Sequence, residues 1–214
     1  MKLRITPGAA LLLTVLLLRG ASALPLLLAA ALHEAGHLLA AKRLGIRLRR
    51  MELDLLGARL YPALPLPSYR KEALLALGGP AASLLTALFC LPARPALQSL
   101  LAASLSLGLF NLLPIEGFDG GRILHALLAQ FKGEVPAHRT LFITTYLSLS
   151  LLFSLSACLL LRYGEDAALA VLSASLFARL FLPFRRPRAA REAHHLKKRG
   201  FKRICENMRE KRRF

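Results

Sequence analysis

Residues 26–41 read LLLAAALHEAGHLLAA, and this stretch decides how the rest of the chain is interpreted. Leucine and alanine fill it, apart from one glycine and three polar side chains, His33, Glu34 and His37. An apolar run of about 20 residues can cross the hydrocarbon core of a bilayer as a helix. Ionisable side chains are costly there, so they mark functional positions in a membrane helix. The stretch therefore predicts a membrane-spanning helix over residues 21–41 that carries a functional cluster.

The cluster has the form HExxH, with His33, Glu34 and His37 at the defining positions. On a helix, two histidines four residues apart share one face and can bind the same zinc ion, while the glutamate reaches the water on that ion. Burying these side chains among leucines without a metal or a partner is unfavourable by several kcal/mol. We therefore interpret the histidines as metal ligands and Glu34 as a general base.

The remaining sequence has the same apolar character. It is 55% hydrophobic, with a mean hydropathy of +0.48 and a net charge of +18, which excludes an ordinary water-soluble globular protein. Together with residues 21–41, these features predict an all-α polytopic membrane protein with about six transmembrane helices. The other apolar runs are residues 7–18, 72–92, 96–114, 140–161 and 166–184.

The first run also resembles a signal peptide. Lys2 and Arg4 precede it, and the small residues Ala21-Ser22-Ala23 follow it like a cleavage site. The next apolar run begins at once and would itself span the membrane, so we expect the segment to be retained. The topology of the remainder is the same in either case.

The basic residues predict the orientation. If the N-terminus is cytoplasmic, 27 of the 30 lysines and arginines lie on the cytoplasmic side, and only Arg19, Arg94 and Arg162 lie on the other. Cytoplasmic loops collect such residues, so both termini are expected in the cytoplasm. The richness in leucine, alanine and arginine suggests a bacterial source, and hence a bacterial cell membrane.

The C-terminal residues form a basic tail. We expect residues 1–185 to form the transmembrane domain and residues 186–214 the tail, without a PDZ or CBS domain. Residues 185–214 contain thirteen basic and three acidic side chains. Such a tail can bind nucleic acid or lie against anionic headgroups. We favour the headgroups, since a basic tail beside a span needs no other explanation, and we expect no nucleic acid partner.

A catalytic zinc site usually has three protein ligands and one open position, so the two histidines need a third partner. Three candidates lie in or just after residues 111–122: Glu116, Asp119 and His125. The predicted helix 96–114 descends to the same side as His37, and Pro114 ends it, so this segment can reach the histidines. His125 is more simply explained as a packed or solvent-facing residue, but the residues alone do not separate Glu116 from Asp119.

Three features carry a family resemblance: HEAGH in an early span, Gly79-Pro80 in the next long span, and FNLLPIEGFDGGRIL at residues 110–124. In these the chain resembles the site-2 proteases, which are intramembrane zinc metalloproteases of regulated intramembrane proteolysis. The resemblance is strongest to the branch that processes a pro-sigma factor in sporulating bacteria.

The resemblance implies roles for particular residues. It makes Asp119 the third ligand of one Zn²⁺ per chain, beside His33 and His37, and Asn111 a catalytic residue that steadies the substrate or the oxyanion. One departure is that a family asparagine often follows the Gly-Pro pair, whereas Ser83 stands nearby here.

The chemistry implied is hydrolysis of a membrane-associated protein near the cytoplasmic face. Zinc lowers the pKa of a bound water toward about 7, and Glu34 takes its proton. A pro-sigma factor is the substrate that the resemblance suggests, with inhibitory membrane proteins as further partners. Two alternatives are an inactive scaffold or regulator of the same fold and a small transporter. The complete motif argues against the scaffold, and the lack of inverted repeats argues against the transporter.

Residues 51–61, MELDLLGARLY, alternate in polarity and then turn near Gly57. This pattern predicts a short membrane-associated β-hairpin between the second and third helices. A helical substrate hides its carbonyl groups, so we hypothesise that the edge of the hairpin receives an unwound substrate as an added strand. The alternative is a plain cytoplasmic loop.

Overall fold

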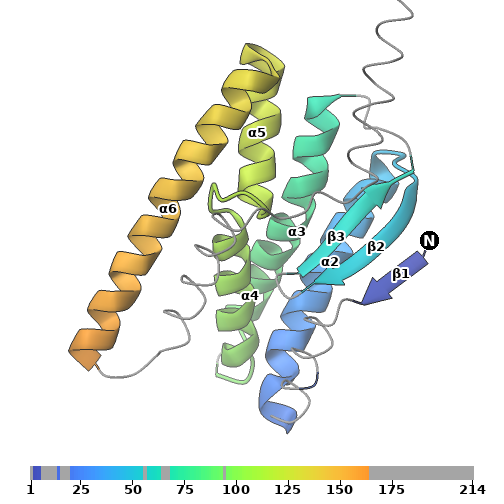
Figure 1. The fold of residues 1–214 in the computed structure, drawn as a ribbon. Helices are drawn as coiled ribbons and strands as arrows, with labels where there is room; N and C mark the ends of the chain where they lie inside the picture. The colour runs from blue at the N-terminus through green and yellow to red at the C-terminus, as the bar shows by residue number, and fades with distance from the viewer. Residues whose placement is uncertain are drawn as a thin grey trace, which may run out of the picture. The chain divides into compact units, whose positions relative to one another are not determined.

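The computed structural model describes residues 2–5, 14, 20–54, 57–63, 68–93 and 95–163 (Figure 1). The chain divides into two units between Leu152 and Phe153, within its last described helix, and the site lies entirely in the first. The elements in chain order are β1 (Lys2–Ile5), the short 3-10 helix η1 (Gly20–Ala23), α2 (Leu24–Arg43), β2 (Leu48–Asp54), β3 (Gly57–Pro62), α3 (Tyr69–Cys90), α4 (Gln98–Asn111), α5 (Asp119–Lys132) and α6 (Glu134–Tyr163).

Helix α2 presents one narrow buried face. Its buried residues recur every fourth position, at Ala29, His33, His37 and Ala41. Beside this face, Gly36 meets Gly78 of α3 so closely that a Cβ atom on Gly36 would lie 2.3 Å from the carbonyl oxygen of Gly78. Small residues allow membrane helices to approach in this way. The contact holds the HExxH segment directly against α3.

Helix α3 is the central element, since it contacts α2, α4 and α5. It begins at Tyr69, where the Ser68 hydroxyl caps the helix by accepting a hydrogen bond of 3.3 Å from the Lys71 N–H. Pro80 lies inside the helix and is buried. The buried face of α3 consists mainly of small residues: Leu75, Ala76, Gly79, Pro80, Ser83, Ala87 and Cys90.

The predicted hairpin is confirmed as β2 and β3, which pair antiparallel. The sequence did not predict β1, which pairs parallel with β2 and makes a three-stranded sheet in the order β1-β2-β3. Met51 of β2 is buried in an apolar cluster with Ala41 of α2 and Leu75 of α3. This cluster attaches the sheet to the two helices that carry and cover the HExxH segment.

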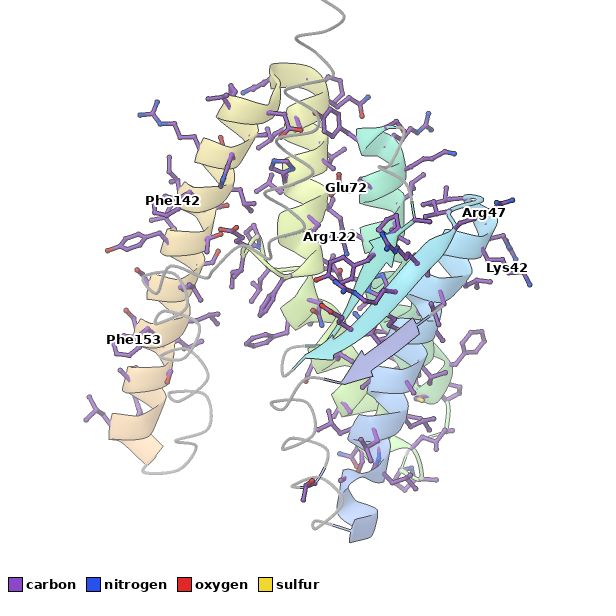
Figure 2. All side chains as sticks on the ribbon, turned by 45° about the vertical axis from the view of Figure 1, so that its right-hand side comes forward. Lys42, Arg47, Glu72, Arg122, Phe142 and Phe153 are labelled. Atoms are coloured by element: carbon purple, nitrogen blue, oxygen red, sulfur yellow. The ribbon has the colours of Figure 1, made fainter. Side chains whose placement is uncertain are left out.

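Three helices in the described part are long and apolar enough to cross a membrane: α2, α3 and residues Glu134–Cys158 of α6. They expose large apolar side chains, such as Phe89 at 77% and Leu151 at 71%, as expected of a surface facing lipid. Figure 2 shows the charged side chains of Lys42, Arg47 and Glu72 toward one end of α2 and α3.

The six-span prediction is not confirmed. The run 96–114 contains α4, a helix of only 14 residues, which falls short of a bilayer-spanning length. Of the run 7–18 only residue 14 is described, and the run 166–184 and the tail 186–214 lie outside the described residues. Between the predicted spans, the structure adds α5, which the sequence did not predict as a helix.

Candidate metal centre

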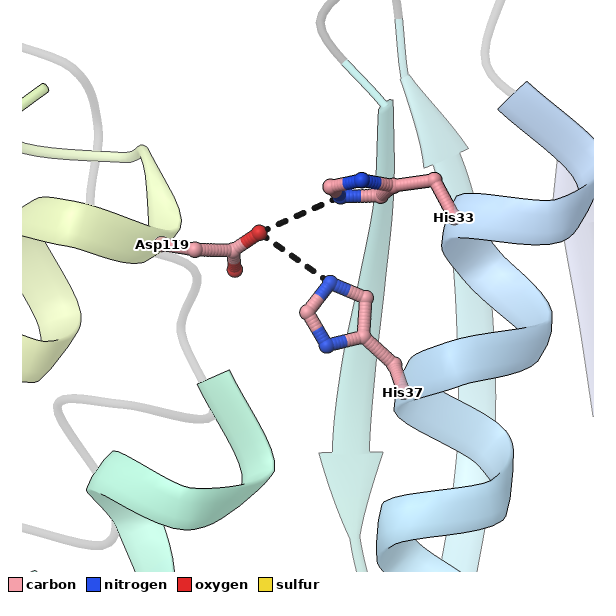
Figure 3. Close-up of side chains that lie close together, drawn as sticks. All are labelled: His33, His37 and Asp119. Carbon is pink, nitrogen blue, oxygen red and sulfur yellow. Dashed lines mark hydrogen bonds and ion pairs between the residues drawn. The ribbon is translucent and has the colours of Figure 1, made fainter. Parts of the chain in front are cut away.

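His33, His37 and Asp119 meet at one point, although 86 and 82 residues separate the histidines from the aspartate (Figure 3). Asp119 Oδ2 lies 3.2 Å from His33 Nε2 and 3.1 Å from His37 Nε2. All three residues are buried, and their ligand atoms lie within 4.8 Å of one another. Within the described part of the chain, this is the one group of at least three metal-ligating side chains.

The segment between α4 and α5 turns Asp119 back toward α2. Helix α5 begins at Asp119 itself and packs tightly against the preceding loop. A Cβ atom on Gly120 would lie 2.0 Å from the Leu112 carbonyl oxygen, so only glycine allows this approach. The loop is also held by Thr145 of α6, whose hydroxyl oxygen accepts a hydrogen bond of 2.8 Å from the Glu116 N–H. Together these contacts fix the position of Asp119 at the start of α5.

The far ring nitrogens of the histidines are held by α3. His33 Nδ1 lies 2.9 Å from the Ser83 hydroxyl oxygen, and His37 Nδ1 lies 2.9 Å from the Leu75 carbonyl oxygen. The Gly79 N–H also lies 3.2 Å from His37 Nδ1, but the carbonyl is closer. A carbonyl only accepts, so the proton of neutral His37 sits on Nδ1. This leaves the lone pair on Nε2 for a metal, the usual arrangement of a metal-binding histidine.

Asp119 is an ionised carboxylate at the start of α5, outside the three candidate spans. In the metal-free chain, burial raises its pKa, but hydrogen bonds donated by Nε2 of His33 and His37 and the nearby positive charges together lower it more strongly, to about 2. A bound zinc ion would take the place of the protons on these two nitrogens. Its second oxygen, Oδ1, lies 3.7 Å from the Arg122 guanidinium. A negative charge at a helix N-terminus is also favoured by the helix dipole. The site therefore offers one anionic oxygen and two imidazole nitrogens.

This donor set suits zinc. A tetrahedral zinc ion with bonds of about 2.1 Å separates its ligand atoms by about 3.4 Å, so these side chains need little adjustment. Gly79 keeps the space beside the ring nitrogens open. A Cβ atom there would lie 2.3 Å from His37 Nε2 and 2.6 Å from His33 Nε2. The residues present therefore fit the ion.

Replacing Gly79 with alanine should remove zinc without unfolding the chain. The added methyl group meets the ends of two imidazole rings rather than backbone, so the rings must shift and weaken their hydrogen bonds to α3. Alanine also favours a helix interior over glycine by about 1 kcal/mol. We expect the Gly79→Ala variant still to unfold cooperatively without metal and to hold less than about a tenth of the wild-type zinc. Mass spectrometry and thermal melting in detergent would measure both.

The other residues singled out in the sequence lie elsewhere. The Glu116 side chain is exposed. His125 Nε2 lies 3.7 Å from a Glu134 carboxylate oxygen, and its ring stacks edge-on against His138. Neither residue joins the histidine pair, whereas Asp119 does. Asn111 donates a hydrogen bond of 3.0 Å to the Leu107 carbonyl oxygen of its own helix.

Sequence reasoning did not assign roles to the three α3 groups that surround the histidines: the Ser83 hydroxyl, the Leu75 carbonyl and the bare Cα of Gly79. Gly79 and Ser83 are four residues apart and share the buried face of α3. That spacing is visible in the sequence. The sequence does not show which helix would pack against this face.

Sequence comparisons relate parts of this chain to known proteins. A model described as peptidase family M50 matches residues 92–155, which include Asp119. The chain is 32% identical over 119 residues to a zinc metalloprotease of Methanocaldococcus jannaschii, a match that covers 50% of this chain and 34% of the relative. The family model thus matches less than a third of this chain.

A similar fold is found among solved structures. The solved structure of a site-2 protease from M. jannaschii is similar, with a TM-score of 0.57 and 24% sequence identity, covering 83% of this chain and 88% of that one. At this identity the likeness concerns the fold. The chain spans about a third of the length of the curated relative it matches.

Proposed function

We propose that this chain is an intramembrane zinc metalloendopeptidase. One observation carries the proposal. Both HExxH histidines lie on an apolar helix of membrane-spanning length, and they meet a buried aspartate from a distant segment. A catalytic zinc site needs three such ligands and an open position. The M50 family match and the metalloprotease relative support the same activity.

His33, His37 and Asp119 would hold the zinc, which would supply a polarised water and a Lewis acid for the peptide carbonyl group. Glu34 follows His33 directly on α2 and is half-buried. Its carboxylate would accept the proton of the attacking water and later pass it to the leaving amine nitrogen. The burial of the site in apolar helices would exclude bulk water until a substrate enters.

Asn111 is proposed as a catalytic residue that steadies the substrate or the oxyanion, because it matches the family motif at the start of N-x-x-P-x-x-x-x-D-G. Its amide now bonds to Leu107 of its own helix. The amide nitrogen carries a second N–H donor, which could bind a substrate while this bond remains. In its favour, Asn111 is the last residue of α4 and precedes the loop that leads to Asp119.

The proposed substrate is a membrane-associated protein cleaved near the cytoplasmic face, and a pro-sigma factor is the first candidate. HEAGH and FNLLPIEGFDGGRIL support this choice, since they resemble the sporulation branch most closely. We propose in the same way a multi-pass protein of a bacterial cell membrane, with both termini cytoplasmic and inhibitory membrane proteins as partners.

Removing the metal tests the proposal directly. We expect the detergent-purified chain to hold about one zinc per molecule and to cut a membrane-tethered pro-sigma factor. A strong zinc chelator should abolish cleavage, and added Zn²⁺ should restore it. Mass spectrometry of the metal and gel analysis of the products would measure this. A well-folded chain without stoichiometric metal would overturn the proposal in favour of a scaffold or transporter.

We also propose that the free edge of β3 receives the unwound substrate as an added strand. Among the described strands, β3 pairs on one side only, with β2. In Figures 1 and 2, β1 lies at the opposite edge of the sheet. Backbone N–H groups on an unpaired edge can bind an extended peptide independently of its sequence.

Proline substitutions in β3 would test this edge. Successive N–H groups point to opposite sides of a strand, so Ala58→Pro and Arg59→Pro remove an inward and an outward donor between them. The substitution that removes the N–H pointing away from β2 should slow cleavage by at least about tenfold, which is the effect of losing one hydrogen bond to the substrate. The zinc content should be unchanged. Leu3→Pro in β1 is the control. Wild-type cleavage by both β3 variants would contradict the proposal.

A further inference from the structure

Ser83 is a fully buried polar residue whose only described hydrogen bond is with a candidate zinc ligand. Its side chain is 0% exposed, on the face of α3 that meets α2. The hydroxyl oxygen lies 2.9 Å from Nδ1 of His33, whose other nitrogen, Nε2, lies 3.2 Å from Asp119 Oδ2. The serine thus touches the ring on the side opposite the metal site.

We propose that Ser83 is a positioning residue for the metal, a role that rests on the proposed function. A neutral imidazole that binds zinc through Nε2 keeps its proton on Nδ1. The Ser83 hydroxyl oxygen accepts this proton in a hydrogen bond. The bond fixes the tautomer and the plane of the ring, so that the Nε2 lone pair points to the metal.

The two histidines differ in how they are held. His37 Nδ1 bonds to the backbone carbonyl of Leu75, which remains whatever side chain is substituted. His33 Nδ1 relies on a side chain, the Ser83 hydroxyl. Outer partners of metal-binding histidines typically affect metal affinity by about 10–100-fold. At this site such an effect should therefore be concentrated at Ser83.

Ser104 provides a matched control. It is also 0% exposed and lies on α4, a neighbour of α3. Its hydroxyl oxygen has no hydrogen-bond partner within the described residues. Ser83→Ala and Ser104→Ala remove the same atom from equally buried positions, but only Ser83→Ala removes a contact with a zinc ligand. Both substitutions favour a helix, so both variants should fold.

The test measures zinc affinity by competition with a chelator, using the full chain in detergent. We expect Ser83→Ala to bind zinc about 10–100-fold more weakly than wild type and Ser104→Ala to bind within about twofold. All three proteins should unfold cooperatively without metal, which would show that a loss of zinc binding is not a loss of the fold. Replacing zinc with Co²⁺ gives a spectroscopic readout, because its visible absorption depends on ligand geometry. Only Ser83→Ala should change this spectrum.

Each outcome bears on the inference. Wild-type affinity and an unchanged Co²⁺ spectrum in Ser83→Ala would overturn it and leave the proposed function intact. Equal weakening in both variants would overturn it too, because the loss would then come from packing. A wild-type chain that holds no zinc would overturn the proposed function, and this inference with it.

Discussion

Replacing Glu34 with glutamine is expected to abolish cleavage while leaving zinc bound. Glutamine has nearly the same shape as glutamate but cannot accept the proton of the attacking water. The candidate ligand atoms belong to His33, His37 and Asp119, so the substitution leaves them in place. Loss of a general base typically costs about 10²–10⁴-fold in rate. The cleavage rate of a membrane-tethered substrate and the zinc content, measured on one preparation, would test this.

Glu72→Gln is the matched control for Glu34→Gln. Glu72 is also a glutamate on an apolar helix, in the first turn of α3, but it is not part of the HExxH motif. The Glu72→Gln variant should cleave the substrate at the wild-type rate. If Glu34→Gln also cuts at the wild-type rate, the proposed mechanism is wrong. If the Glu34→Gln variant loses its zinc instead, Glu34 holds the metal and another group acts as the base.

Replacing Asp119 with alanine should have the largest effect on zinc binding. Asp119 supplies the anionic oxygen of the site and contacts both histidines, at 3.1 and 3.2 Å. Without it, two neutral imidazoles remain, which is one ligand fewer than a catalytic zinc site uses. We expect Asp119→Ala to bind zinc more than about 100-fold more weakly than wild type, a larger loss than is typical for a residue that only hydrogen-bonds to a zinc ligand. Cleavage should be abolished. Chelator competition and mass spectrometry would measure both effects.

Glu116→Ala separates this effect from a general loss of negative charge. Glu116 lies three residues before Asp119, in the loop, but its side chain is exposed. Its contact with Thr145 runs through the backbone N–H, which alanine keeps. Glu116→Ala should therefore bind zinc as the wild type does. The opposite pattern, with zinc lost from Glu116→Ala and kept by Asp119→Ala, would refute the assignment of the third ligand.

The elements that were predictable from the sequence are those set by local spacing. The apolar run around His33 predicted a helix, and the structure has one at Leu24–Arg43. The alternation in residues 51–61 predicted the hairpin of β2 and β3. The expectation of six spans was not confirmed: hydropathy does not show that α4 has only 14 residues, and most of two other predicted runs lies outside the described residues. The pairing of β1 with β2 was also missed, since it joins strands more than 40 residues apart.

The sequence by itself determined that His33 and His37 share a helix face, because residues four apart on a helix always do. It did not separate Asp119 from Glu116, and the family resemblance made that choice. Only the tertiary structure placed Asp119 beside the histidines, the Ser83 hydroxyl behind one of them and the bare Cα of Gly79 against both. Periodicity describes one helix at a time, whereas these contacts depend on how three helices pack and where a loop ends.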